Sequence, residues 1–221
     1  MSPGGAEPPP WPLVTVDIDG TLTTVHGWKV IADRFGRTAE YARTQQRFFA
    51  REIDEDEHLV DLLRLAEGRP IGELEAALDA TPRIGGIREG VRLLHEAGSR
   101  VALLTHNPPY VCAWYVRRFG FDSFEGTGAQ PIADGRIGAP AGVRADKPAG
   151  LARLAARFGT TAAGVTHVGD GWADAALFPQ VGRGIALNSS LPEVERAADV
   201  VLRSADFRDV ARRLASLGPR R

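Results

Sequence analysis

The sequence LVTVDIDGT, residues 13–21, decides the fold of this chain and points to its chemistry. Its first four residues are β-prone and mostly apolar, so they predict a buried strand that ends at two carboxylates. Strand alternation would place Asp17 and Asp19 on one side, with Ile18 on the other. Carboxylates this close repel each other unless a positive group lies beside them, and Mg²⁺ prefers such oxygen ligands. A solvated acidic turn is the alternative, because Asp and Gly are common in turns.

The composition is that of an ordinary globular protein. The chain has 221 residues, of which 43% are hydrophobic and 25% charged, which suits one domain with an insertion or two small domains. The formal net charge is −1, and no block of like charge occurs. We therefore expect neither a nucleic-acid groove nor a polybasic membrane surface.

Three features predict the compartment. Cys112 is the single cysteine, which excludes an intramolecular disulfide framework and, without a basic neighbour, predicts a buried structural thiol. No apolar run approaches the ~20 residues of a membrane span. Residues 1–12 are rich in Pro and Gly and lack the apolar stretch of a secretory signal, so we expect a disordered leader and a cytoplasmic protein.

The basic residues carry a further clue. Of 27 basic residues, only Lys29 and Lys147 are lysines. A lysine kept in an arginine-rich chain indicates a place where a compact ammonium is needed and a planar guanidinium is not, although chance is the alternative. Only Lys147 gains support from its position, because it lies in a loop just before a predicted helix.

Helical spacing follows the first strand. Apolar residues recur with a helical period over residues 27–81, divided at Gly36, Asp54 and residues 68–70. The acids of residues 54–57 favour a helix start. The segment therefore predicts three or four helices inserted directly after the first strand.

From residue 86 onwards, helices and strands alternate. We predict helices at 87–97, 109–119, 148–158, 173–178 and 207–217, strands at 100–105, 165–169, 184–187 and 200–202, and a β-hairpin within 127–137. The alternation predicts an α/β fold, a doubly wound, Rossmann-like parallel sheet with an inserted α-helical cap. We assign the cap to residues 24–83 and the core to residues 13–23 and 84–221.

Polar clusters lie where a doubly wound sheet binds ligands, beyond the carboxyl ends of its strands. Each cluster alone fits a turn or a helix start, such as a cap at Thr105. Four in this order indicate a site for phosphate and metal. In chain order the clusters are Asp17 and Asp19, then Thr105, His106 and Asn107, then Lys147, then Asp170, Gly171 and Asp174.

These motifs resemble those of the haloacid dehalogenase-like (HAD) hydrolase superfamily, in particular the branch similar to phosphoserine phosphatases. The resemblance rests on Asp-Ile-Asp-Gly-Thr at residues 17–21 and on the Gly-Asp-x-x-x-Asp pattern of residues 169–174. It covers nearly the whole chain after residue 12. The helical insert occupies the position of that family's helical cap.

The resemblance implies a role for each polar residue. Asp17 would be the nucleophile that forms an aspartyl-phosphate, and Asp19 would act first as the acid and then as the base. Thr105 and Lys147 would stabilise the phosphoryl group and its developing charge. The implied ligands of Mg²⁺ are Asp17, the main-chain carbonyl of Asp19, Asp170 and, directly or through a neighbour, Asp174. The implied substrate contacts are Thr21, His26, His106, Asn107 and Gly171.

The substrate positions depart from the phosphoserine phosphatase pattern. His26 stands where that family has a Glu for the amino group, and Leu62 where it has an Arg for the carboxylate. These departures disfavour phosphoserine. Trp28 and Trp172 either stack on a flat substrate or pack between cap and core. The histidines predicted to be structural or on the surface are His58, His95 and His167.

We therefore predict a Mg²⁺-dependent phosphatase that acts on a small phosphorylated metabolite beneath a closing cap. We expect no nucleic-acid or membrane partner, and the sequence does not define the oligomeric state. The alternatives are a phosphomutase of the same superfamily and a non-catalytic binding module on a relic fold. Asp19 disfavours a dehalogenase, because those enzymes lack the second aspartate.

Overall fold

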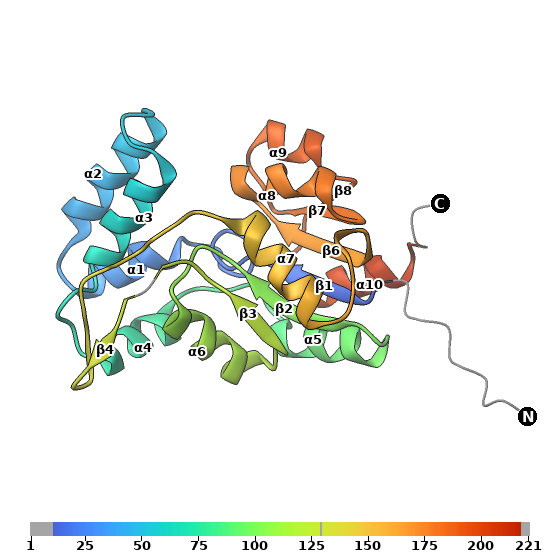
Figure 1. Cartoon of the computed structure of the whole chain (residues 1–221), viewed down its shortest axis with the longest axis horizontal. Coiled ribbons are helices and arrows are strands. Elements are labelled where there is room, and N and C mark those ends of the chain that lie inside the picture. Colours follow the sequence, from blue (N-terminus) through green and yellow to red (C-terminus); the bar gives the residue numbers. More distant parts are fainter. Residues whose placement is uncertain (1–10, 129, 218–221) are drawn as a thin grey trace, which may run out of the picture.

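The computed structural model describes residues 11–128 and 130–217, and it has the predicted α/β architecture (Figure 1). Its centre is a parallel sheet with the strand order β3-β2-β1-β6-β7-β8. The strands are β1 (Leu13–Val16), β2 (Arg100–Leu104), β3 (Ser123–Glu125), β6 (Val165–Gly169), β7 (Arg183–Leu187) and β8 (Val200–Leu202). The order reverses at β1, so the switch point that binds ligands in such sheets lies beside the first strand.

Helices cover both faces of the sheet, and strand alternation divides its apolar residues between them. Val14 and Val16 face α5 (Ile87–Glu96), α6 (Pro109–Phe119) and α10 (Arg208–Ala215). Leu13 packs on the other face with α7 (Lys147–Arg157) and α8 (Trp172–Leu177). Thr15 and Asp17 share the parity of Leu13, so Asp17 leaves the strand on the α7 side.

The helical insert forms a cap beside the sheet (Figure 1). Its helices are α1 (Gly27–Arg34), α2 (Thr38–Phe49), α3 (Glu55–Arg64) and α4 (Ile71–Ala80). A bridge between Thr23 and Arg83 joins the two connections to the core. As the acidic start predicted, Asp54 caps α3 by accepting from the backbone N–H of Glu57 at 2.9 Å.

The predicted hairpin exists and fixes one edge of the cap. It consists of β4 (Ile132–Ala133) and β5 (Arg136–Ile137), which pair antiparallel. The N–H of Gly68 donates to the carbonyl of Ile137 at 2.7 Å, and the N–H of Ile71 donates to the carbonyl of Gly135 at 2.9 Å. The end of the cap that carries α2 and α3 lies away from this anchor (Figure 1).

The structure differs from the sequence-based expectations in four places. Strand β3 and helix α9 (Pro192–Ala197) were not predicted, because both are too short for a clear period. Strand β1 ends at Val16, so Asp19 is oriented by its hydrogen bonds and not by strand alternation. Residues 1–10 of the predicted leader lie outside the described residues, but Trp11 is packed in the core with 4% of its surface exposed.

Two further expectations concern the thiol and the membrane. Cys112 is fully buried, as predicted, and burial raises the pKa of its thiol well above the usual range. None of the helices within residues 11–128 and 130–217 has both the length and the apolar character that a membrane span requires.

Candidate active site

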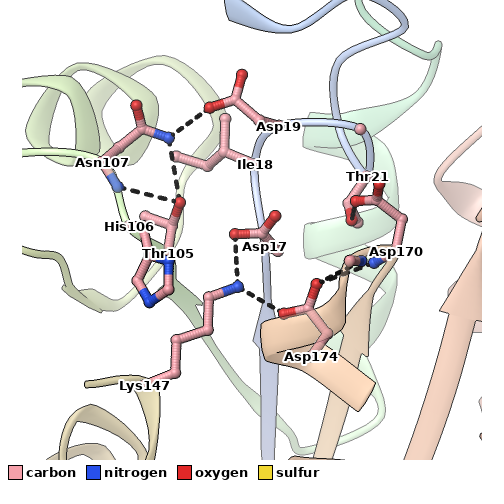
Figure 2. Close-up of polar contacts among 12 residues, drawn as sticks. Asp17, Ile18, Asp19, Thr21, Thr105, His106, Asn107, Lys147, Asp170 and Asp174 are labelled. Carbon is pink, nitrogen blue, oxygen red and sulfur yellow. Dashed lines mark hydrogen bonds and ion pairs between the residues drawn. The ribbon is translucent and has the colours of Figure 1, made fainter. Parts of the chain in front are cut away.

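The candidate site lies at the carboxyl end of β1, where its two neighbours in the sheet also end. Because β2 and β6 flank β1, Thr105 approaches Asp17 from one side and Asp170 from the other (Figure 2). The N-terminus of α7 brings Lys147 to the same point. Residues that lie far apart in the sequence therefore meet at one edge of the sheet.

Lys147 lies between two carboxylates. Its Nζ is 3.0 Å from Oδ1 of Asp17 and 2.5 Å from Oδ1 of Asp174, and only 4% of its side chain is exposed. Burial alone would lower the pKa of this lysine, but the charges of Asp17 and Asp174 and the hydrogen bonds to them hold the pKa above its usual value. The ammonium is therefore a fixed positive charge in contact with Asp17.

Asp174 already has partners for both of its oxygens. Oδ1 accepts from Lys147 and lies 2.9 Å from Nε2 of His167, and Oδ2 accepts from the N–H groups of Asp170 and Gly171 at 3.0 and 2.9 Å. Burial opposes the charge of Asp174, but Lys147 and His167 outweigh it and lower its pKa. Asp174 thus holds the loop after β6 and positions Lys147.

Three carboxylates lie close enough to share one cation. An oxygen from each of Asp17, Asp170 and Asp174 lies within 4.8 Å of the others. Burial and the neighbouring carboxylates raise the pKa of Asp170 to about 8, and burial is also the main cause of the raised pKa of Asp17. A hard cation with oxygen ligands would offset this repulsion, so the donor set fits Mg²⁺.

Gly20 lets Asp170 approach this cluster. Its φ of +83° lies in the left-handed region, and a Cβ there would come within 2.1 Å of Oδ2 of Asp170. Any other residue would therefore be strained and would collide with the carboxylate. Oδ1 of Asp170 accepts from the hydroxyl of Thr21 at 2.7 Å.

Asp19 is held by the cap as well as by the core. Its Oδ1 accepts from the N–H of Gly27, the first residue of α1, at 2.6 Å. Its Oδ2 accepts from the amide of Asn107 at 2.8 Å, and the same amide donates to Oγ1 of Thr105 at 3.1 Å. Trp28 of α1 donates through Nε1 to Oδ1 of Asn107 at 3.1 Å. The position of α1 is thereby coupled to Asp19.

A cavity of about 400 Å³ opens above these side chains, between the cap and the core. We call it the site cavity. Its floor contains Asp17, Asp19, Thr105, Asn107, Lys147 and Asp170. Its cap wall comes from α1, α2 and α3 and contains His26, Trp28, Gln45, Phe48, Phe49, Glu55, His58, Leu59 and Leu62. Trp172 and Leu191 are among the core residues at its margin.

The residues expected to contact substrate have different surroundings. His26, His106 and Gly171 line the site cavity. Asn107 also lines it, but its amide is bonded to Asp19 and Thr105. The expected contact between Thr21 and the substrate is not found. Thr21 is fully buried, does not line the cavity and orients Asp170.

His167 and His58 were expected to be structural or on the surface, and their contacts at the site were not predicted. His167 is fully buried in β6, and its Nδ1 lies 2.9 Å from Oγ1 of Thr15, so it links β1 to Asp174. The available signal was an imidazole in a short strand that is otherwise uncharged. His58 lines the cavity and stacks on Phe48, with ring centroids 4.0 Å apart. It gave no separate signal, because a helical period alone does not say which residues face a cavity.

Comparisons with known proteins bear on the family and the fold of the chain. A family model described as haloacid dehalogenase-like hydrolase matches residues 11–182. A phosphoserine phosphatase of Archaeoglobus fulgidus is 28% identical over 181 residues, which is 80% of this chain and 52% of that protein. The chain therefore spans about half the length of this curated relative.

Solved structures share the fold. One, described as a phospho-aspartyl intermediate analogue of phosphoserine phosphatase, superposes with a TM-score of 0.77 at 21% identity and covers 92% of this chain and 98% of its own. A HAD family hydrolase from Salmonella enterica serovar Typhi gives a TM-score of 0.79 at 20% identity, over 87% of this chain and 68% of its own.

Proposed function

The chain belongs to the haloacid dehalogenase-like hydrolases, and from this premise we propose that it is a Mg²⁺-dependent phosphatase for a small phosphomonoester. The observation that carries the proposal is the position of Lys147, buried between Asp17 and Asp174. A carboxylate that must attack an anionic ester needs a positive charge beside it, and the ammonium of Lys147 supplies one.

In the proposed reaction, an oxygen of Asp17 attacks phosphorus and the bond from phosphorus to the ester oxygen breaks. Asp19 gives its proton to the leaving oxygen, so the product leaves as a neutral alcohol. Asp19 then takes a proton from water, whose oxygen attacks phosphorus and breaks the bond to Asp17. Inorganic phosphate is released and Asp17 is regenerated.

The other residues of the floor support these steps. Thr105 donates to a phosphoryl oxygen, and Asn107 fixes both Thr105 and Asp19 through its amide. Asp17, Asp170 and the main-chain carbonyl of Asp19 would hold Mg²⁺, with Asp174 nearby. When bound, the ion would neutralise charge on the phosphoryl group and on the carboxylates.

The surroundings of the site also support a small substrate. The cap wall covers Asp17 and Asp19, so a closed cap would shield the reacting atoms from bulk water. A protein or a nucleic acid fits such a covered site poorly. A cytoplasmic location is part of the proposal and is supported by Cys112, a buried thiol in a chain without a second cysteine.

The test is phosphate release from ethyl phosphate in the presence of Mg²⁺. Asp17→Asn should lower turnover by on the order of 10⁴-fold or more, because the nucleophile is lost. Asp33→Asn is the matched control, since Asp33 is an exposed aspartate of α1 that pairs with Lys29. Mass spectrometry of rapidly quenched wild-type protein should find a phosphoryl group on Asp17.

Two results would contradict the proposal. Turnover by Asp17→Asn near the wild-type rate would exclude the covalent mechanism. With a hexose phosphate as the substrate, isomerised sugar phosphate in place of free phosphate would identify a phosphomutase that uses the same residues.

A further inference from the structure

We propose that the site cavity selects a phosphomonoester whose leaving group is uncharged and carries an aromatic ring. This inference rests on the proposed phosphatase function and adds the substrate class. Three independent features of the cap wall carry it: its charge, its aromatic surface and its unpartnered polar atoms.

Among the named residues of the cap wall there is no arginine or lysine that could pair with an anionic leaving group. Among the residues of 11–128 and 130–217 that line the site cavity, no arginine occurs, although arginine supplies all but two of the 27 basic residues of the chain. Lys147 lines the cavity, but its ammonium already forms ion pairs with Asp17 and Asp174. A carboxylate on the leaving group would therefore be buried without an arginine or a free lysine beside it.

Two further ionisable groups of the wall are Glu55 and His58, and neither supplies a cation to the leaving group. Glu55 lies 3.1 Å from Nδ1 of His106 and so has a partner within the protein. Burial is the main cause that lowers the pKa of His58 to about 4, so this imidazole is neutral near pH 7. Leu62, named in the sequence analysis as the departure from the family's arginine, lines the cavity with an apolar side chain.

Aromatic surface is concentrated where the cap meets the core. The ring of Phe48 stacks on His58, and its centroid lies 6.2 Å from that of Trp172. Phe49 lies 5.9 Å from Trp172 in an edge-on arrangement. Phe49 is 62% exposed and Trp172 41% exposed, so large apolar rings remain uncovered at the edge of the cavity. A flat ring is the group that such surfaces bind best.

Polar atoms of the same wall are buried without a hydrogen-bond partner. They are Nδ1 of His26, Nε2 of Gln45 and Nε2 of His58, and Nε2 of His106 on the core side of the cavity is unpartnered as well. All four residues line the site cavity. The neutral imidazole of His58 donates through one nitrogen and accepts through the other. Hydroxyl, carbonyl or ring-nitrogen groups of an uncharged ligand therefore suit it.

The size of the cavity agrees with this class of ligand. Its volume of about 400 Å³ lies in the range of about 300–1,000 Å³ that is typical of small-molecule sites. One phosphoryl group on the floor leaves space for a ring beside Phe48 and Trp172.

The first test compares three esters that differ only in the leaving group. We expect kcat/KM for benzyl phosphate to exceed that for ethyl phosphate by at least about 10-fold, and O-phosphoserine to fall below ethyl phosphate. O-phosphoserine turned over as well as benzyl phosphate would overturn the inference and leave the phosphatase function standing.

Binding of non-hydrolysable analogues tests the preference for a ring independently of the phosphatase activity. Calorimetry with benzylphosphonate and ethylphosphonate should give tighter binding of the benzyl compound. If that preference is found but no ester releases phosphate, the proposed function is wrong and the ring selectivity of the cavity stands. Equal binding of the two phosphonates would overturn the inference.

Two pairs of variants locate the selectivity. Phe49→Ala should lower the ratio of kcat/KM for benzyl over ethyl phosphate by about 2- to 10-fold. Ile132→Ala, in an exposed apolar residue of the hairpin that does not line the cavity, should leave the ratio unchanged. An unchanged ratio in Phe49→Ala would remove Phe49 from the ring site.

The second pair adds a charge. Gln45→Arg should raise the kcat/KM of O-phosphoserine relative to ethyl phosphate, because it places a cation on the cap wall. Gln46→Arg adds the same charge to the same helix at an exposed position outside the cavity lining and should have no such effect. An equal gain in both variants would show that general electrostatic attraction, and not the wall, controls selectivity.

Discussion

The floor and the cap wall of the site cavity are built on opposite principles. On the floor, carboxylates, an ammonium and an amide are joined by short hydrogen bonds, as between Lys147 and Asp174 and between Asn107 and Asp19. On the wall, aromatic and apolar side chains surround imidazoles with unpartnered nitrogens. Reaction chemistry needs groups fixed in advance, whereas recognition needs groups left free for the ligand.

This difference predicts which kinetic property each variant should change. A change on the floor should lower turnover of every substrate by a similar factor. A change on the wall should alter the ratio between substrates. Variants of the floor and of the wall can therefore be told apart by comparing several substrates.

Replacing the buried lysine tests whether the floor needs a compact cation. Lys147→Arg should lower kcat for ethyl and benzyl phosphate alike by about 10²–10³-fold, because a planar guanidinium cannot occupy the small space between Asp17 and Asp174. Lys29→Arg is the control, since Lys29 is exposed and pairs with Asp33. Near-normal rates in Lys147→Arg, with an unchanged melting temperature, would mean that charge alone matters.

His167 extends the floor into the interior of the sheet. His167→Leu should reduce kcat by about 10- to 100-fold, the usual effect of removing a partner that orients a functional group. His167→Gln, which can still bond to Asp174 and Thr15, should recover part of the loss. His95→Gln changes a surface histidine bonded to Asp122 and should not alter kcat. Equal losses in the Leu and Gln variants of His167 would indicate packing and not hydrogen bonding.

The carboxylate cluster should make stability depend on pH and on Mg²⁺. The pKa of Asp170 is about 8 in the folded chain, against 3.8 for an aspartate carboxyl in the unfolded chain. Such a raised pKa favours folding below pH 3.8, and this contribution is lost as the pH rises through about 8. His58 has the opposite dependence, and its contribution to stability is lost only below about pH 6.5. The pKa of Asp17 is raised as well, so comparison with Asp170→Asn is needed to assign the change between pH 6.5 and 8 to Asp170.

Denaturant titrations of metal-free protein measure this contribution. Relative to Asp170→Asn, the wild-type free energy of unfolding should fall by about 1–2 kcal/mol between pH 6.5 and 8. Mg²⁺ should reverse the fall in the wild type and have little effect on the variant. A pH-independent difference between the two proteins would contradict the raised pKa of Asp170.

Trp28 joins the two regions and should give the smallest effect. Trp28→Phe keeps the ring in the wall but removes the hydrogen bond to Asn107. We expect kcat to fall by about 3- to 10-fold for all substrates, with little change in their ratio, because Asn107 positions Asp19 and Thr105. A change confined to the ratio would place Trp28 with the wall alone.

Much of the floor could be predicted from the sequence, because its residues follow strands with a clear local pattern. Asp17 and Asp170 come directly after or close to predicted strand ends, and the hydrophobic period identified most of the elements between them. Strand β3 and helix α9 escaped this reasoning. Helix α9 begins at Pro192 and has acids in its first turn, which are both signals of a helix start. The segment is short and has little period, so these signals were not used.

The partners of the floor residues could not be predicted in the same way. The roles of Thr21 and His167 depend on contacts across about 150 residues of chain, with Asp170 and with Thr15. Both are polar residues buried beside the sheet, and their hydrogen bonds exist only once β1 and β6 are paired.

By itself, the sequence determined the α/β class, the inserted helices and the order of the polar motifs, since period and turn chemistry are local properties of the chain. Only the tertiary structure decided that Lys147 joins Asp17 to Asp174, that His167 supports this pair, and that the cap wall is aromatic and free of arginine. Those features follow from which strands and helices become neighbours, and neighbours distant in the chain are selected by packing and not by local sequence.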